Sequence, residues 1–519
     1  MKLKDILKNI KIIDSNFDID FNLEINNIAF HTKDVKSSTI FVAIKGYVTD
    51  GHNFIGKAKD LGADIVIVED FSDVNVNQIK VENSRKTLAD ISCNFYSNPS
   101  KEMNVVGITA TNGKTTTAFM VDNVLTKAGK KTGMIGTVLT KYGDIKIPSL
   151  LTTPESHTLQ KYIRNMKDEN ISNLVMEVSS SAQELYRNRN IDFDIVTFNN
   201  LGHEHIDQHG SFEKYFQYKS RLIRYAKKDS IAILNKDDKL IYSLKDKTKA
   251  RVLTFSLENS SADFSISDLD LSTGKGNFKF HINRDINIKN LHINKGEIEI
   301  NLGSVGYSSV MNSVVAIIIS LCLNIEKSII QKALYDFKGV ERRFELIYDN
   351  EFKILDDHFA NEKNIDSTMS TLKEMDYSKL HILYAIRGKR GYSVNKEIAE
   401  RLVKWIKILK PESICATLSK DTVTEKDRVT DEELKVFKAV LDDANIEYKI
   451  YDNLNESIKE NIDLLKEDDI LLLAGCQGMD KAVGFVKDKL VLDGKEKNLT
   501  SLIDIVNNRI CWIFVFLVL

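Results

Sequence analysis

The sequence has few cysteines and prolines: five cysteines and four prolines stand among 519 residues. The cysteines are scattered and form no CxxC pair, which excludes a disulfide framework and a zinc site built on paired thiolates. With 24 glycines, 43% hydrophobic and 28% charged residues, the chain is neither fibrous nor disordered. The composition is that of a soluble globular protein, and we expect it in the cytoplasm.

The chain also lacks a charge imbalance and a long apolar run. Its 72 Lys and Arg nearly cancel its 74 Asp and Glu, so no overall field favours nucleic acid or an anionic membrane. Residues 1–14 mix charges into an amphipathic pattern, unlike a signal peptide. The apolar stretch Ile510–Leu519 is roughly half as long as a membrane-spanning helix. We expect a monomer with no nucleic-acid partner and no stable membrane span, and leave the role of this stretch open.

The length predicts about three domains of α/β class. Strand-like and helix-like segments alternate from the start, and the turn Asn98-Pro99-Ser100 marks a first boundary. We assign a small α/β domain to residues 1–99, a central parallel-sheet domain to 100–338, a Rossmann-like domain without GxGxxG to 339–495, and an apolar tail to 496–519.

Several segments carry the strand signals on which these domains depend. Apolar runs at 174–178, 194–198 and 230–234 are typical of a parallel sheet with crossover helices. Residues 262–303 alternate polar and apolar positions, which predicts an antiparallel ribbon. The third domain is predicted from five apolar runs: FKILDD, LHILYAI, SICATLS, IEYKIYD and DILLLAG.

The strongest chemical signal is the loop GITATNGKT, which runs from Gly107 to Thr115 between a predicted strand and a predicted helix. Backbone N–H groups of such a loop surround phosphates, its lysine bridges them, and the following hydroxyl holds Mg²⁺. Lys114 and Thr115 stand at those two positions. The loop fails the strict pattern GxxxxGK[ST] at its first glycine, so an ordinary strand-to-helix turn is the alternative.

Several further motifs follow this loop in a fixed order. With TATNGKTTT, they make the chain resemble the Mur ligases, most closely the UDP-N-acetylmuramoyl-tripeptide synthetases of that family. The resemblance covers most of the first two predicted domains. It is carried by DGHNFIGKAKDLGA, LTTPE, MEVSSSAQELYR, NNLGHEHIDQHGSFEKYFQYKSRL and LNKDD.

This resemblance implies an ATP-dependent ligase of peptidoglycan-precursor synthesis, which adds an amino acid to a UDP-N-acetylmuramoyl dipeptide through an acyl phosphate. It places Lys114, Glu177, His205 and Lys219 in catalysis. Mg²⁺ would be held by Thr115, Glu177, His205 and Lys219, the lysine being carbamylated by CO₂. A carbamate turns a cation into an oxyanion that attracts a metal ion.

The resemblance also implies two sets of binding residues. ATP contacts fall on Gly107, Thr111, Asn112, Gly113, Lys114, Thr115, Thr116, Asn312, Arg343 and Asp357. Contacts to the UDP-muramoyl peptide fall on Thr32, Lys33, Thr152, Thr153, Pro154, Ser179, Ser180 and Arg187. Two positions depart from the family: Thr32-Lys33 replaces a Ser-Arg pair, and Ser181 replaces a histidine.

The third domain departs further from the family pattern. Ala360 and Glu362 replace the His and Pro of the DYAHxP motif, and AGCQGMDKA replaces GKGHE. The diaminopimelate-selecting Asp-Asn-Pro-Arg is absent from LSKDTVTEKDRV. The cations Arg387, Lys389 and Arg390 either hold a substrate anion or form a solvated loop.

The resemblance leaves two alternatives open beside the tripeptide synthetase. One is a Mur-fold ligase with a different carboxylate acceptor, which the altered third domain favours. The other is a nucleotide-binding regulatory protein without catalysis, which the intact Lys114, Glu177, His205 and Lys219 disfavour. The sequence does not identify the amino acid that is added.

Overall fold

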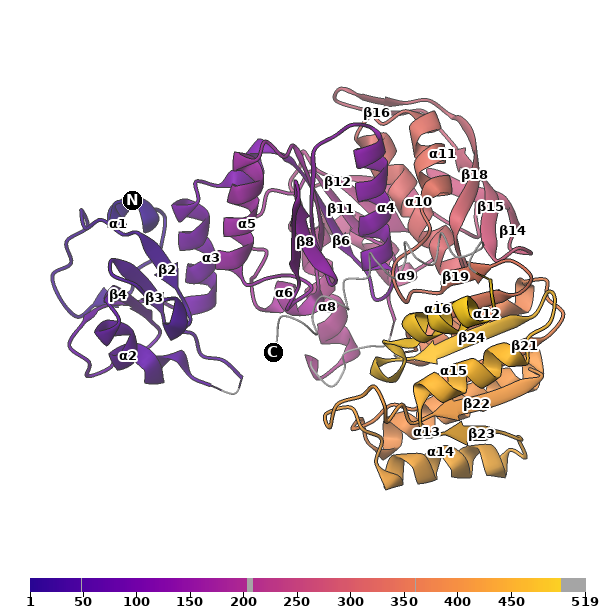
Figure 1. Cartoon of the computed structure of the whole chain (residues 1–519). Helices are drawn as coiled ribbons and strands as arrows, with labels where there is room; N and C mark the ends of the chain where they lie inside the picture. Colours follow the sequence, from indigo (N-terminus) through magenta and orange to yellow (C-terminus); the bar gives the residue numbers. More distant parts are fainter. Residues whose placement is uncertain (48, 203–208, 360, 496–519) are drawn as a thin grey trace. The chain divides into compact units, whose positions relative to one another are not determined.

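The computed structural model describes residues 1–47, 49–202, 209–359 and 361–495. The chain divides into two compact units, Met1–Ser256 and Leu257–Leu519, which are described separately below (Figure 1). Both units combine helices with largely parallel sheets, so the predicted α/β class is confirmed. No helix in the described part of the chain combines the length and the apolarity needed to cross a bilayer.

The first unit begins with a small sheet in the order β1-β5-β4-β3-β2. Its central strands are continuous apolar runs, as expected where a parallel sheet is covered on both faces, and separate hydrophobic clusters pack around it. Its strands are β1 (Asp14–Ser15), β2 (Asn27–Ala29), β3 (Thr39–Val42), β4 (Ala63–Val68) and β5 (Asn77–Lys80), and its helices include α2 (Ile55–Asp60) and α3 (Ser84–Phe95).

A second sheet in this unit runs in the order β13-β12-β11-β6-β10-β7-β8-β9 and is parallel from β13 to β7. The strands are β6 (Asn104–Thr109), β7 (Thr132–Ile135), β8 (Leu139–Tyr142), β9 (Ile145–Pro148), β10 (Asn173–Glu177), β11 (Ile195–Phe198), β12 (Ile231–Asn235) and β13 (Arg251–Phe255). The helices α4 (Lys114–Lys127), α5 (Ser156–Asp168), α6 (Ser180–Glu184) and α8 (Phe212–Arg224) belong to the same unit. The parallel strands follow the predicted pattern, whereas the antiparallel β7-β8-β9 meander was not predicted.

The second unit opens with the predicted antiparallel ribbon, which is confirmed by β14 (Phe264–Asp270), β15 (Lys275–Ile282) and β18 (Gly296–Val305). Two helices follow, α10 (Tyr307–Cys322) and α11 (Lys327–Asp336). The alternating burial of β15 explains the polar–apolar pattern of its sequence.

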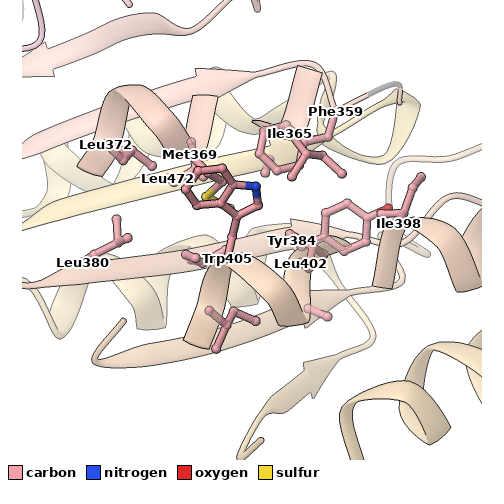
Figure 2. Packing of buried hydrophobic residues seen from close by; sticks show 14 of the residues in the cluster. Phe359, Ile365, Met369, Leu372, Leu380, Tyr384, Ile398, Leu402, Trp405 and Leu472 are labelled. Atoms are coloured by element: carbon pink, nitrogen blue, oxygen red, sulfur yellow. The ribbon is translucent and has the colours of Figure 1, made fainter. Parts of the chain in front are cut away.

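The rest of the second unit is built on a sheet in the order β19-β20-β24-β21-β22-β23, parallel except for β19. Its strands are β19 (Glu345–Asp349), β20 (Lys353–Asp357), β21 (Leu380–Ala385), β22 (Ser413–Thr417), β23 (Lys449–Tyr451) and β24 (Ile470–Gly475). They include all five predicted runs. Its helices are α12 (Glu362–Glu374), α13 (Tyr392–Leu409), α14 (Asp431–Asp443), α15 (Leu454–Asp463) and α16 (Ala482–Leu492). Figure 2 shows part of its core, where Trp405 of α13 lies near Met369 of α12.

Candidate active site

The loop after β6 lies at the carboxyl edge of the parallel sheet, where α/β proteins commonly bind ligands. Gly113 precedes α4 with φ of 84°, a left-handed conformation that favours glycine. Asn200 holds the loop: its Oδ1 accepts from Asn112 N at 2.9 Å, and its Nδ2 donates to Asn112 O at 2.8 Å. Asn200 therefore fixes the shape of the loop, a role that the sequence did not single out.

The predicted ATP contacts of the first unit lie along this one segment. Gly107 is inside β6, where an added Cβ would stand 2.7 Å from the Phe193 ring, so this glycine permits close packing. The remaining residues are Thr111, Asn112 and Gly113 in the loop, and Lys114, Thr115 and Thr116 in the first turn of α4.

The two predicted catalytic lysines meet at one carbonyl oxygen of the loop. Lys114 Nζ donates to Ala110 O and to Thr111 O, each at 3.0 Å. Lys219, on α8 and only 2% exposed, donates from Nζ to the same Ala110 O at 2.6 Å. Two ammonium groups on one oxygen repel each other, whereas a carbamate on Lys219 would attract Lys114.

Glu177 ends β10 beside this loop and is 1% exposed. Its carboxylate accepts from Thr115 Oγ1 at 3.0 Å, from Thr137 N at 2.8 Å and from Thr137 Oγ1 at 2.9 Å. A Cβ at Gly136 would stand 2.3 Å from Glu177 Oε1, so only glycine lets the backbone approach this carboxylate. Thr137 and Gly136 are further site residues that the sequence did not predict.

The donor set fits a hard divalent cation. Buried carboxylates are normally paired with a cation or bound to a metal, and the hydrogen-bond partners of the Glu177 carboxylate are the uncharged donors of Thr115 and Thr137. The Thr115 hydroxyl and the Glu177 carboxylate are oxygen ligands of the kind that Mg²⁺ prefers. The predicted ligand His205 lies outside the described residues.

The predicted precursor-binding hydroxyls surround Glu177. Thr153 is fully buried, donates to Glu177 O at 2.8 Å and accepts from Ser179 N at 3.2 Å. The hydroxyl groups of Thr152 and Thr137 form a hydrogen bond at 3.1 Å. Ser179 caps α6 by accepting from Ala182 N. Thr153 and Ser179 thus shape the segment that carries Glu177.

The remaining predicted precursor contacts of the first unit are more dispersed. Ser180 Oγ lies 2.9 Å from Nε2 of the buried His209, so a hydrogen bond fixes this serine hydroxyl against the histidine. Pro154 is half-buried between the two threonines and Glu155. Thr32 and Lys33 form the start of a 3₁₀ turn after β2, where Thr32 is half-buried and Lys33 is exposed.

Arg187 is held by Glu155, the last residue of the LTTPE motif. Arg187 donates from Nε at 2.9 Å and contacts the same carboxylate from Nη2 at 2.8 Å. A second cation, Arg85 of α3, approaches Glu155 from Nη1 at 3.5 Å. Glu155 could have been found from its motif, whereas nothing in the sequence distinguished Arg85.

In the second unit, the structure brings some of the predicted ATP contacts together. Asp357 ends β20 and accepts from Phe344 N at 2.8 Å and from Thr368 Oγ1. Burial raises the pKa of Asp357, while Thr368, Phe344 and the positive charge of Arg343 oppose that rise. Arg343 itself is exposed, and Asn312 is buried in α10.

Comparison with known proteins shows to which family the chain belongs. Residues 108–320 match the model of the Mur ligase middle domain, and residues 24–96 match the Mur ligase family, catalytic domain. A protein of Clostridium tetani named UDP-N-acetylmuramoyl-L-alanyl-D-glutamate–2,6-diaminopimelate ligase is 32% identical over 95% of this chain and 97% of its own. The chain belongs to the Mur ligase family. A ligase of the same name from Bacillus velezensis is 35% identical over 73% of this Mur ligase and 77% of its own length.

Solved structures agree with the Mur ligase fold. A UDP-N-acetylmuramoyl-L-alanyl-D-glutamate–2,6-diaminopimelate ligase superposes with a TM-score of 0.69 at 19% identity, covering 95% of this chain and 99% of that one. MurF ligase from Thermotoga maritima in complex with ADP gives a TM-score of 0.60 at 21% identity, covering 90% and 98%. At these identities the likeness bears on the fold alone.

Two departures from the Mur ligase pattern meet in the second unit. The resemblance aligns Arg343 with the arginine of the family's GRxE junction and therefore Arg342 with its glycine. Arg342 has a φ of 56°, a value that glycine favours. The buried guanidinium of Arg342 contacts Asp356 at 3.4 Å, the carboxylate of Asp480 and the carbonyl of Gly475. Asp480 and Gly475 belong to the AGCQGMDKA segment that replaces GKGHE. The two departures therefore form one ion-paired arrangement.

Proposed function

We propose that this Mur ligase is a UDP-N-acetylmuramoyl-tripeptide synthetase that uses ATP to join an amino acid to a UDP-N-acetylmuramoyl dipeptide. The observation that carries the proposal is the convergence of Lys114, Lys219 and the Thr115–Glu177 pair beside the phosphate loop. The relatives in Clostridium tetani and Bacillus velezensis are named for the UDP-N-acetylmuramoyl-L-alanyl-D-glutamate acceptor. These names favour the muramoyl dipeptide over another carboxylate acceptor.

The reaction has two steps, each of which gathers negative charge on oxygen. A carboxylate oxygen of the acceptor attacks the γ-phosphorus of ATP, and ADP leaves. The amine then attacks the acyl carbon, loses a proton, and expels inorganic phosphate to give the amide. Preorganised cations and dipoles stabilise such charge in the transition state.

The residues of the first unit provide that preorganisation. Lys114 exchanges its two loop carbonyls for phosphate oxygens, and the N–H groups at the start of α4 point at the same charge. Thr115 and Glu177 would hold Mg²⁺, which neutralises charge on the phosphates when bound. His205 is proposed as a further ligand, and Thr137 fixes the Glu177 carboxylate that would face the ion.

Lys219 is proposed to act as a carbamate formed with CO₂. Its Nζ shares Ala110 O with Lys114. An ammonium group on Lys219 would therefore repel the ammonium group of Lys114 beside the positions assigned to the phosphates and the metal ion. A carbamate would instead offer oxygen atoms to the cations of the site. This supports the carbamylated form as the active one.

The nucleotide contacts of the second unit are also part of the proposal. Asn312, Arg343 and Asp357 are assigned to ATP, and the buried Asp357 is held in place by Phe344 and Thr368. The enzyme is proposed to work in the cytoplasm as a monomer. Its place in peptidoglycan synthesis connects it with cell-wall formation, cell shape and division.

The test is acceptor-dependent turnover. Purified protein with ATP, Mg²⁺ and a panel of amino acids should release phosphate only when UDP-N-acetylmuramoyl-alanyl-glutamate is present, and mass spectrometry should show the acceptor plus one amino acid. The same panel with a folate-like acceptor is the control. Phosphate release with the control acceptor, and none with the muramoyl dipeptide, would refute the proposal.

A further inference from the structure

Arg85 lies at a place that helix stability does not explain. It is in the first turn of α3, which Asn83 caps by accepting from Lys86 N at 2.9 Å. Arg85 and Lys86 put two positive charges at the helix end where the macrodipole disfavours them. Ser84 beside them is fixed to Glu69 at 2.9 Å. Because the helix dipole disfavours a cation at this position, stabilisation of α3 does not account for Arg85.

The side chain of Arg85 shares a carboxylate with a residue predicted to bind the precursor. Glu155 is contacted by Arg187 through Nε and Nη2 at 2.9 and 2.8 Å, and by Arg85 only at 3.5 Å. One carboxylate neutralises one guanidinium, so this trio carries a surplus positive charge. The side chains of Arg85, Glu155 and Arg187 are 20%, 19% and 11% exposed, so a ligand can reach them.

The neighbourhood adds further cations. Lys86 lies over the Tyr186 ring at 5.1 Å, and the Arg221 guanidinium lies 5.5 Å from the centre of the same ring. Tyr186 directly precedes Arg187 and has φ of 58°, an uncommon value for a tyrosine. The segment that carries Arg187 is therefore held between cations that belong to α3 and α8.

This cationic cluster is connected to the reacting centre. Arg187 Nη1 donates to Thr153 O at 3.4 Å, and Thr153 Oγ1 donates to Glu177 O at 2.8 Å. The cluster thus lies one buried threonine away from the backbone of Glu177, the residue whose carboxylate is assigned to Mg²⁺. An acceptor whose reacting carboxyl group sits near Glu177 would bring its other oxyanions to the arginines.

We propose that Arg85 is a precursor-binding residue: its guanidinium receives an oxyanion of the UDP-muramoyl dipeptide, while Glu155 keeps Arg187 in place. The inference rests on the proposed function and adds a residue to it. Guanidinium groups suit phosphate and carboxylate oxygens equally. The oxyanion belongs either to the diphosphate or to the carboxylate that is not activated.

The experiment compares Arg85→Gln with a matched control, Arg189→Gln. Arg189 also joins the Arg187 segment to α3, through Asp90 at 2.7 Å, but takes no part in the cluster. For Arg85→Gln, KM for the UDP-muramoyl dipeptide should rise about 10- to 100-fold, with kcat and KM for ATP within threefold of wild type. Arg85→Lys should recover part of the loss, and Arg189→Gln should leave this KM within twofold.

Calorimetric binding separates the two oxyanions. If the diphosphate is bound, Arg85→Gln should weaken UDP-N-acetylmuramic acid and the dipeptide precursor alike; if the carboxylate is bound, only the dipeptide precursor should weaken. A precursor KM within twofold of wild type for Arg85→Gln, or an equal rise for Arg189→Gln, would overturn the inference alone. Wild-type protein that neither binds nor uses the precursor would overturn the proposed function, and this inference with it.

Discussion

The phosphate-loop region of the first unit and the C-terminal sheet of the second unit depart from the family to different degrees. Around Glu177, the residues predicted from motifs contact one another directly or through Thr137 and Thr153. Around Arg342, the motif residues are replaced, and Arg342 forms ion pairs with Asp356 and Asp480. Phosphoryl transfer needs fixed positions for lysine, hydroxyl and carboxylate, whereas residues that take no part in this chemistry can change more freely.

The largest effect is expected at the phosphate loop. Lys114→Ala should lower kcat by about 10³-fold or more, because the lysine's charge acts on phosphates in the transition state. Binding of the UDP-precursor should stay nearly intact, since the proposed role of the lysine's charge is on the phosphates of ATP. Steady-state kinetics with calorimetry checks both. If Lys114→Ala retained more than a tenth of wild-type kcat, the assignment of Lys114 to phosphate binding would be wrong. The phosphate-loop region would then no longer differ from the C-terminal sheet in keeping the family's site residues.

A second large effect is expected at Lys219. Lys219→Ala should be inactive, with kcat reduced at least about 10²-fold, and small carboxylates added in solution should restore part of the activity. Mass spectrometry of active wild-type enzyme should show an added carboxylate on this residue. An alanine variant with full activity, or active enzyme that carries only the free amine, would refute the role proposed for Lys219.

In the second unit the corresponding test concerns stability. Arg342→Ala removes the guanidinium that contacts the fully buried Asp356 at 3.4 Å, and should lower the free energy of unfolding by about 3–5 kcal/mol. Arg343→Ala, at the exposed neighbouring position, is the control and should change it by less than about 0.5 kcal/mol. Urea unfolding checks both. Equal stability of the two variants would show that the ion-paired arrangement contributes nothing.

A smaller effect on folding stability is expected at the contact between α5 and α3, the helix that carries Arg85. His157 lies 3.4 Å from Ser92 and 3.5 Å from Tyr96, and burial, aided by Lys161, lowers its pKa from 6.5 to about 4. Its unfolded form therefore binds a proton first as pH falls below 6.5, so folding stability is lost between pH 6.5 and 4. Between pH 7 and pH 5 this should amount to about 1–2 kcal/mol.

His157→Gln is the control for that pH dependence. The glutamine variant should lose less stability than wild type on acidification, because no imidazole remains to be protonated in the unfolded chain. Parallel curves for the two proteins, measured by urea unfolding at pH 7, 6 and 5, would show that this histidine does not carry the effect.

Much of the fold could be predicted from the sequence, because buried parallel strands are continuous apolar runs that alternate with helices. The five runs of the C-terminal sheet are examples, as is the strand that ends at Glu177. The β7-β8-β9 meander could not be predicted in this way, since β9 is a short, largely exposed strand whose pattern resembles a loop.

The site was predictable only where residues belong to a contiguous motif. Lys114, Thr115 and Glu177 were found in this way, and the structure brings them together. Thr137 and Arg85 were missed, because their roles depend on contacts with residues 40 and 70 positions away in the chain. No local pattern records such contacts.

The amine substrate tests the difference between the two regions most directly. Relatives are named for diaminopimelate, but here Lys420 pairs with Asp452, and Asp421 accepts from Leu454 N and Asn455 N. Those two charged groups of the LSKDTVTEKDRV segment are thus used within the protein. The segment also lacks the Asp-Asn-Pro-Arg motif, and the arginine that it does contain, Arg428, pairs with Glu425 at 2.9 Å. Loss of an arginine fork that clamps a distal carboxylate removes roughly 2–4 kcal/mol of discrimination.

The decisive measurement is kcat/KM for diaminopimelate, lysine, ornithine and small neutral amino acids, taken side by side with UDP-N-acetylmuramoyl-alanyl-glutamate as acceptor. We predict acceptor-dependent turnover in which diaminopimelate is preferred by no more than about tenfold. Such a result would show that one enzyme combines an intact phosphate-loop site with an altered amine site. A hundredfold preference for diaminopimelate would contradict this account and show that another cation, such as Arg387, Lys389 or Arg390, clamps its distal carboxylate.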